Sequence, residues 1–163
     1  MTNASEFGSK PELPWYWEGN VQAQVARFLI SEGWTIESTA DTISRERGVD
    51  IVASRDQRRL SVEVKGFPGT VYARGARAGQ PKPTSPTLQA RHWLAQAFLA
   101  SCLIGGDSNP PEVALALPDV PRYRDLVGRI MYAIDRLGFQ VLLVDEAGAV
   151  RRLGVSKSDR SAS

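Results

Sequence analysis

The sequence predicts an α/β domain with a mixed central sheet flanked by helices, and three observations support this class. Apolar residues recur at helical spacing in three segments, two neighbouring runs alternate with a two-residue period, and two further runs are continuously apolar. The order of these segments is αβββαβαβ with a last short strand, and 163 residues suffice for one hydrophobic core. We expect a single domain over residues 14–155, between flexible tails at 1–13 and 156–163.

The first helix is expected from Asn20, a favourable N-cap, to about Glu32, with Gly33 as its C-cap. Its apolar stripe recurs at helical spacing: Val21, Val25, Phe28 and Leu29. A short strand over residues 34–37 and a polar loop over residues 41–48 are expected to follow.

A hairpin is expected next, from the alternating runs Val49–Ser54 and Arg59–Lys65 joined by a turn at residues 55–58. The segment from Gly66 to Ser85 is rich in glycine, proline and basic residues, which predicts a loop with at most a short strand at residues 71–72.

The rest of the chain alternates helix and strand. Ser85 as N-cap and Pro86 begin a helix that continues to about residue 104, and an apolar strand over residues 112–117 follows it. A third helix is expected from Pro121 to the glycine at 138, with a predicted buried stripe of Leu126, Ile130, Ile134 and Leu137. Strands over residues 139–144 and 149–153 complete the domain.

Composition excludes several classes of site. The chain has one cysteine, Cys102, and one histidine, His92, which excludes an internal disulfide and metal sites built on several histidines or cysteines. No apolar run approaches the roughly 18–20 residues of a membrane span, and the first ten residues are polar, so we expect a cytoplasmic protein without membrane attachment. The chemistry is then expected from carboxylates, lysine and arginine.

The hairpin register places two acids side by side. The register that matches apolar residues across the hairpin pairs Val49 with Val64, Ile51 with Val62, and Ala53 with Leu60. Asp50 then lies opposite Glu63, and Lys65 projects on the same side about 6.5 Å further along the strand. Opposed carboxylates repel each other, whereas Mg²⁺ or Mn²⁺ would bind them. The alternative is an ordinary solvated outer face of the strand.

These residues carry a family resemblance. Gly48-Val49-Asp50-Ile51-Val52 followed by Val62-Glu63-Val64-Lys65-Gly66 resembles the PD-(D/E)xK nuclease superfamily, which has the restriction-endonuclease-like fold. The resemblance covers roughly residues 18–144, because the αβββαβ order also fits the core of that fold. Val49 stands where a proline would precede the aspartate.

The resemblance implies a role for each matching residue. Asp50 and Glu63 would hold Mg²⁺ or Mn²⁺, aided by the Val64 carbonyl. Lys65 would orient the attacking water or help to deprotonate it, and would stabilise the charge that develops on phosphorus. Glu18, at the start of the first helix, is the expected additional metal ligand, although the helix dipole alone also favours an acid there.

The resemblance also points to Gln89, because many relatives carry a glutamine in the helix after the Glu-x-Lys strand. Gln89 could contact a backbone phosphate or the attacking water, and the alternative is a solvent-facing side chain. His92, one turn further on, is expected to have a packing or surface role.

Charge is unevenly distributed. Residues 64–106 contain five cations and no acid. Within this stretch Arg74, Arg77 and Lys82 are expected to overhang the site as a clamp for phosphates, with Arg45 and Arg47 on its other side. The alternative to a phosphate clamp is an ordinary solvated loop.

Three aromatic residues near the N-terminus also allow two interpretations. Trp15, Tyr16 and Trp17 could stack on bases, or could cover an edge of the core.

The function we expect is that of a hydrolase, a magnesium-dependent endonuclease. It would cut DNA in a structure-dependent or nicking manner rather than at a specific sequence, leaving a 5′-phosphate. Relatives often form dimers, so a homodimer is compatible with this expectation. The alternatives are a nuclease-fold module that binds nucleic acid with a weak or silent site, and a structural domain that recruits proteins.

Overall fold

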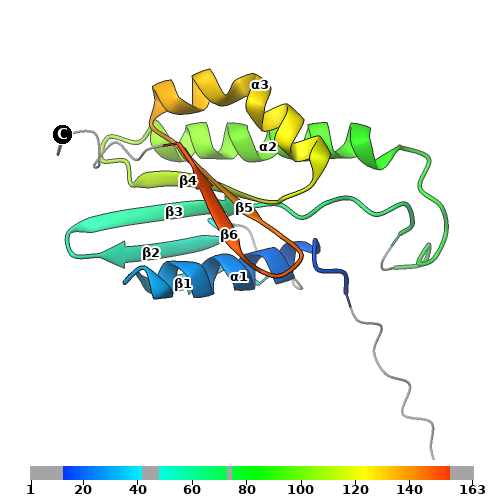
Figure 1. Cartoon of the computed structure of the whole chain (residues 1–163), viewed down its shortest axis with the longest axis horizontal. Coiled ribbons are helices and arrows are strands. Elements are labelled where there is room, and N and C mark those ends of the chain that lie inside the picture. Colours follow the sequence, from blue (N-terminus) through cyan, green and yellow to red (C-terminus); the bar gives the residue numbers. More distant parts are fainter. Residues whose placement is uncertain (1–12, 42–47, 73–74, 155–163) are drawn as a thin grey trace, which may run out of the picture.

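The computed structural model describes residues 13–41, 48–72 and 75–154. Six strands form one mixed sheet in sequence order, with helix α1 (Glu18–Ser31) on one face and α2 (Pro86–Gly105) and α3 (Pro121–Leu137) on the other (Figure 1). The strands are β1 (Thr35–Thr39), β2 (Ile51–Arg55), β3 (Arg58–Val64), β4 (Glu112–Pro118), β5 (Gln140–Val144) and β6 (Val150–Leu153). β3, β4 and β5 are parallel and the other neighbours are antiparallel, which confirms the predicted α/β class with a mixed sheet.

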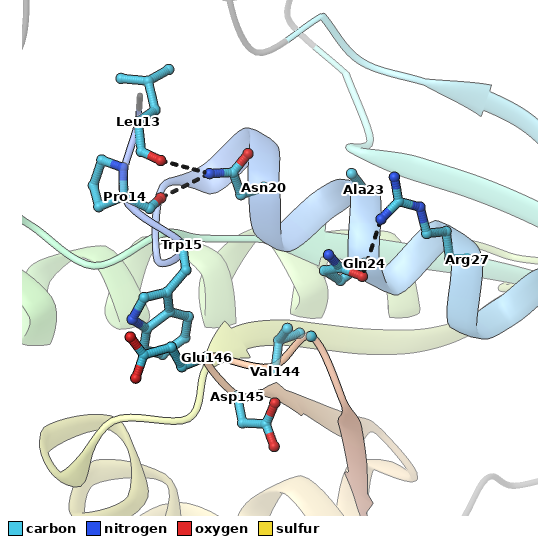
Figure 2. Close-up of a pocket in the computed structure, with 11 residues that line it drawn as sticks. Leu13, Pro14, Trp15, Asn20, Ala23, Gln24, Arg27, Val144, Asp145 and Glu146 are labelled. Carbon is cyan, nitrogen blue, oxygen red and sulfur yellow. Dashed lines mark hydrogen bonds between the residues drawn. The ribbon is translucent and has the colours of Figure 1, made fainter. Parts of the chain in front are cut away.

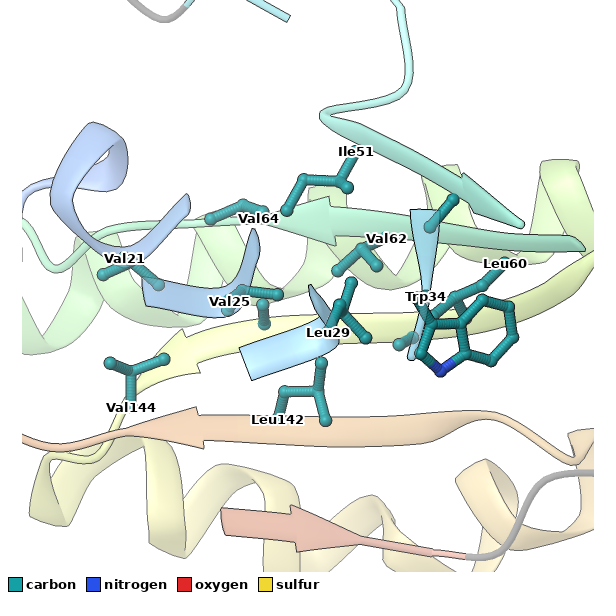
Figure 3. Packing of buried hydrophobic residues seen from close by; sticks show 13 residues of the cluster. Val21, Val25, Leu29, Trp34, Ile51, Leu60, Val62, Val64, Leu142 and Val144 are labelled. Atoms are coloured by element: carbon teal, nitrogen blue, oxygen red, sulfur yellow. The ribbon is translucent and has the colours of Figure 1, made fainter. Parts of the chain in front are cut away.

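Two hydrophobic clusters join the helices to the sheet. Val21, Val25 and Leu29 of α1 are fully buried against the side chains of β2 to β5 (Figure 3). A second cluster lies between the opposite face of the sheet and helices α2 and α3. Both faces of β4 and β5 are therefore covered, which explains why their sequences are continuously apolar rather than alternating.

The predicted hairpin register is confirmed. Ile51 pairs with Val62 and Ala53 pairs with Leu60, so the apolar residues of both strands face α1. The pairing begins later than predicted, because β2 starts at Ile51, and the expected pairs of Val49 with Val64 and of Asp50 with Glu63 lie outside the ladder. Beyond the last pair, the Val64 N–H donates to the Asp50 side chain at 2.7 Å, while the Asp50 carbonyl accepts hydrogen bonds from the Ala40 N–H at 2.9 Å and from the Gln22 side-chain amide at 2.8 Å.

One prediction about the helices was wrong, and a second was confirmed only in part. α1 begins at Glu18 with Trp17 at the N-cap, and the Asn20 side chain instead donates to the carbonyls of residues 13 and 14. In α3 the predicted stripe is confirmed as buried at Ile134, where Tyr123 and Val127 are buried with it, whereas Leu126 and Ile130 are only partly buried and Leu137 is 36% exposed. Gly138 adopts a left-handed conformation after Leu137, and Phe139 enters the core in place of Leu137.

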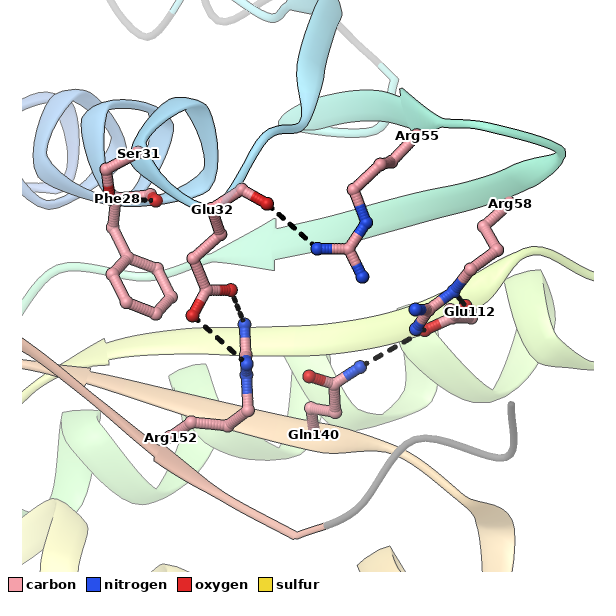
Figure 4. A network of polar contacts seen from close by, with 8 residues as sticks. All are labelled: Phe28, Ser31, Glu32, Arg55, Arg58, Glu112, Gln140 and Arg152. Atoms are coloured by element: carbon pink, nitrogen blue, oxygen red, sulfur yellow. Dashed lines mark hydrogen bonds and ion pairs between the residues drawn. The ribbon is translucent and has the colours of Figure 1, made fainter. Parts of the chain in front are cut away.

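A polar network fixes the hairpin end of the sheet (Figure 4). Arg58 donates to both oxygens of Glu112, at 2.5 and 2.9 Å, and Arg152 pairs with Glu32 at the end of α1. These two acids therefore have structural partners, which supports the choice of Glu18 over Glu32 as a site residue. Among the described residues, no helix combines the length and the apolar character needed to cross a membrane.

Candidate functional site

The candidate site lies where β3 ends and α1 begins. In α/β sheets this carboxyl end of the parallel strands is the usual place for a ligand. Gly66 brings the two segments together, because an added Cβ would lie only 2.6 Å from the Glu18 nitrogen and 2.7 Å from the Tyr16 carbonyl oxygen. The nearby Gly66 N–H in turn lowers the pKa of the Glu18 carboxyl group. Glu18 is thereby held beside the strand that carries Glu63 and Lys65.

Hydrogen bonds fix the other side chains of the site. The Val64 N–H donates to Asp50 Oδ2 at 2.7 Å, so Asp50 reaches β3 although it precedes β2. Lys65 Nζ donates to Glu63 Oε1 at 2.8 Å and to the Val64 carbonyl oxygen at 3.0 Å. The Lys65 and Glu63 side chains are only 19% and 11% exposed, so this ion pair is well shielded from solvent. The predicted group of Asp50, Glu63, Lys65 and Glu18 therefore lies together.

Burial raises the pKa of all three carboxyl groups, and repulsion between acids adds to this for Glu18 and Glu63. Desolvation is the main cause that raises the pKa of Glu18, Asp50 and Glu63 above their ordinary values. The charge of Asp50 raises the pKa of Glu18 and of Glu63 further, while Lys65 lowers the pKa of all three acids. The three acids and Lys65 form one electrostatic group, since the pKa of each acid responds to the charge of Lys65.

Lys65 remains the cation of this group. Burial by itself lowers the pKa of Lys65, but the hydrogen bond to Glu63 and the charges of Glu63, Glu18 and Asp50 outweigh burial, so its pKa is raised. The side chain is therefore an ammonium donor at neutral pH. When all three acids are ionised, one ammonium leaves two negative charges uncompensated, and a divalent cation would balance them.

The donor chemistry suits Mg²⁺ or Mn²⁺, although no complete ligand cage is preformed. Among residues 13–41, 48–72 and 75–154, no three His, Cys, Asp or Glu side chains converge closely enough to hold an ion as they stand. Lys65 also occupies two of the expected ligands, because its ammonium is bonded to Glu63 and to the Val64 carbonyl. Both oxygens become available to a cation if the ammonium moves away.

Gln89 and His92, the predicted residues that follow the Glu-x-Lys strand, both lie on α2. The Gln89 side chain donates to the Thr84 carbonyl at 3.2 Å, one turn before its own position in α2, and no described contact joins it to the acids. His92 is exposed on the same helix, in line with the expected surface role.

The basic clamp is described only in part. Arg77 and Lys82 lie 4.4 and 5.9 Å from the ring centre of Tyr72, and the segment that carries them extends past the end of β3 (Figure 1). Arg45, Arg47 and Arg74 lie outside the described residues.

Two residues that support the site were not predicted. Gln22, one turn after Glu18 and 8% exposed, donates to the carbonyls of Ala40 and Asp50. Tyr123 of α3 is fully buried and donates to the Gly66 carbonyl at 2.8 Å. Both contacts join segments that are distant in sequence, so no local pattern could have indicated them.

Replacing Tyr123 by phenylalanine is expected to lower the free energy of unfolding by about 1–2 kcal/mol, because the buried Gly66 carbonyl loses its donor. Urea denaturation measures the change. Tyr132→Phe is the control, since Tyr132 is 79% exposed on the same helix and should be neutral. Equal stability of Tyr123→Phe and the wild type would contradict a supporting role for this bond.

The raised carboxyl pKa values predict how stability depends on pH in metal-free protein. The protonated forms of Glu18, Asp50 and Glu63 are favoured more in the folded state than in the unfolded chain. Protonation therefore stabilises the folded state fully below the ordinary pKa values of 3.8 for Asp and 4.5 for Glu, and this stabilisation is lost as the pH rises through the raised pKa values. Glu18→Gln is therefore expected to match the wild type in acid and to exceed its stability at neutral pH. Denaturation across this range, with exposed Glu37→Gln as control, measures the difference. A Glu18→Gln variant less stable than wild type at neutral pH would refute the electrostatic coupling.

A separate hollow of about 450 Å³ lies beside α1 and the turn between β5 and β6 (Figure 2). Trp15 forms part of its wall, and its described charged residues are Arg27, Asp145 and Glu146. Two acids against one arginine make this hollow unfavourable for a phosphate chain.

Comparison with models of known protein families, with curated proteins and with solved structures found no match. The interpretation of the site therefore depends on its own geometry and chemistry.

Proposed function

We propose that the chain is a metal-dependent nuclease that hydrolyses phosphodiester bonds of DNA, built on a restriction-endonuclease-like core. One observation supports this above all others: Asp50, Glu63 and Lys65 lie together at the end of β3, with Glu18 from α1 beside them. A cluster of buried acids with a net negative charge is costly for stability alone, and a bound cation accounts for it.

Asp50, Glu63 and the Val64 carbonyl would hold the cation, with Glu18 at its side. A bound Mg²⁺ or Mn²⁺ would supply Lewis-acid activation of the phosphate and a more acidic water. The raised pKa of Lys65 keeps its ammonium protonated, so it orients the water and stabilises the phosphoryl charge as a donor rather than accepting a proton. The carboxylates are left as the proton acceptors.

Incubation of the purified protein with labelled single-stranded, nicked, branched and duplex substrates in Mg²⁺ and in Mn²⁺ tests this function directly. Cleavage that needs the metal and stops with EDTA is the expected result. No cleavage of any substrate in either metal would overturn the nuclease proposal.

The second candidate is a nuclease-fold module that binds nucleic acid without cutting it. The contact of Lys65 with two of the proposed ligand oxygens favours this candidate, because an ammonium that stays there excludes the cation. Nucleic-acid binding with no thermal stabilisation by millimolar Mn²⁺ is its signature.

Arg77 and Lys82 are proposed to contact backbone phosphates. The double variant Arg77→Ala, Lys82→Ala is expected to weaken nucleic-acid binding to every sequence alike. The plot of log binding constant against log salt concentration should also become less steep, by about one unit of slope for each phosphate contact that is lost. Fluorescence anisotropy over a range of salt concentrations measures both effects. Arg136→Ala, an exposed change in the last turn of α3, is the control. An unchanged slope in the double variant would remove these two cations from the interface.

A further inference from the structure

We infer that the hollow next to the candidate site binds an unpaired nucleobase of the substrate strand, so that the protein prefers single-stranded or frayed nucleic acid to an intact duplex. This inference rests on the proposed function and adds the class of substrate to it.

The hollow has the size and lining of a small-molecule pocket. Its volume is about 530 Å³, within the usual range for ligand sites. Its wall includes three aromatic rings, two prolines that begin helices and one cation: Trp15, Tyr16, Phe67, Pro86, Pro121 and Arg122. All three aromatic residues are partly exposed, so part of their surface is accessible from the hollow.

The hollow adjoins the acids and Lys65 along the backbone. Phe67 follows Lys65 by two residues, Tyr16 precedes Glu18 by two residues, and the Phe67 N–H donates to the Tyr16 carbonyl at 2.9 Å. Two extended residues span about 6.5 Å. A nucleotide whose phosphate lies at Lys65 can therefore place the adjoining sugar and base in the hollow.

The aromatic rings are fixed before any ligand arrives. Tyr16 meets Phe67 edge to face with 6.3 Å between ring centres, and Phe67 meets Tyr123 in the same way at 5.6 Å. Trp15 packs against Tyr16 at 5.7 Å. Such rings lose little conformational freedom on binding, and they offer stacking to any base whatever its sequence. A base inside a duplex is already stacked and paired, so only an unpaired base can enter.

The charge around the hollow suits the phosphates on either side of that base. Arg122 donates to the Thr87 carbonyl at 3.3 Å and pairs with the half-exposed Asp125, and its own side chain is 29% exposed. Helices α2 and α3 begin at Pro86 and Pro121, and neither has an acid in its first turn. Both helix N-termini add partial positive charge at the rim of the aromatic hollow.

Binding measured in EDTA separates this inference from catalysis. Fluorescence anisotropy compares a labelled single strand with the matching blunt duplex, and a fluorescent adenine analogue in the single strand reports stacking by quenching. Trp15→Ala and Tyr16→Ala are each expected to weaken single-strand binding about fivefold or more and to reduce the quenching, with little effect on the duplex. Trp15→Phe should retain most of the affinity. Tyr132→Ala is the matched aromatic control, because Tyr132 is exposed and lies outside the hollow.

The outcomes distinguish the two proposals. An equal decrease for single strand and duplex, or no decrease in either variant, would overturn the base-binding inference while leaving cleavage intact. Preferential single-strand binding and quenching that depend on Trp15 and Tyr16, without cleavage in any metal, would support the base site and overturn the nuclease. If Tyr16→Ala does not unfold cooperatively on heating, that variant is misfolded, and the comparison of Trp15→Ala with Trp15→Phe then tests the inference.

Discussion

Replacing Glu63 by glutamine is expected to slow cleavage by about a thousandfold or more and to abolish stabilisation of the fold by Mn²⁺. Glu63 is the proposed ligand that also pairs with Lys65, and loss of the charge-stabilising cation costs several kcal/mol at the transition state. At a metal concentration 100 times the dissociation constant, the wild type should gain about 2.7 kcal/mol of stability and the variant none. Single-turnover cleavage and thermal unfolding with and without Mn²⁺ measure the two effects.

A matched variant strengthens this test. Asp50→Asn should behave like Glu63→Gln, and its side-chain carbonyl can still accept the Val64 N–H that positions residue 50. Exposed Glu37→Gln on β1 is the control and should leave both readouts unchanged. Full cleavage by either site variant would also expose a contaminating nuclease.

Replacing Lys65 by methionine is expected to change cleavage and metal affinity in opposite directions. Cleavage should fall by about 100–1,000-fold, because the donor that stabilises the phosphoryl charge is removed. Mn²⁺ should bind about tenfold or more tightly, because the variant frees Glu63 Oε1 and the Val64 carbonyl and removes a positive charge next to them. Isothermal titration measures the affinity.

Lys65→Arg is the control for charge. It keeps the positive charge beside the acids, so metal affinity should stay close to that of the wild type, whereas the different shape of the guanidinium should still impair cleavage. If Lys65→Met bound Mn²⁺ more weakly than the wild type, the ammonium could not be a competitor for the ligand oxygens. Unchanged cleavage would remove Lys65 from the reaction.

Local patterns predicted most of the architecture. The apolar alternation in the hairpin specified which residues pair, because a shift by one position would turn Ile51, Ala53, Leu60 and Val62 away from α1. The helix ends were less predictable. Asn20 has the side chain of a good N-cap, yet α1 begins before it, and its side-chain amide instead binds the carbonyls of the preceding residues 13 and 14.

The sequence by itself determined that Asp50, Glu63 and Lys65 come close together, because a hairpin is a local structure and burial of one face sets its register. Only the tertiary structure decided what surrounds them. Glu18 approaches from another element, Gln22 and Tyr123 hold the backbone from two different helices, and burial sets the pKa shifts. These features depend on contacts between residues far apart in the chain, and no periodicity within one segment encodes such contacts.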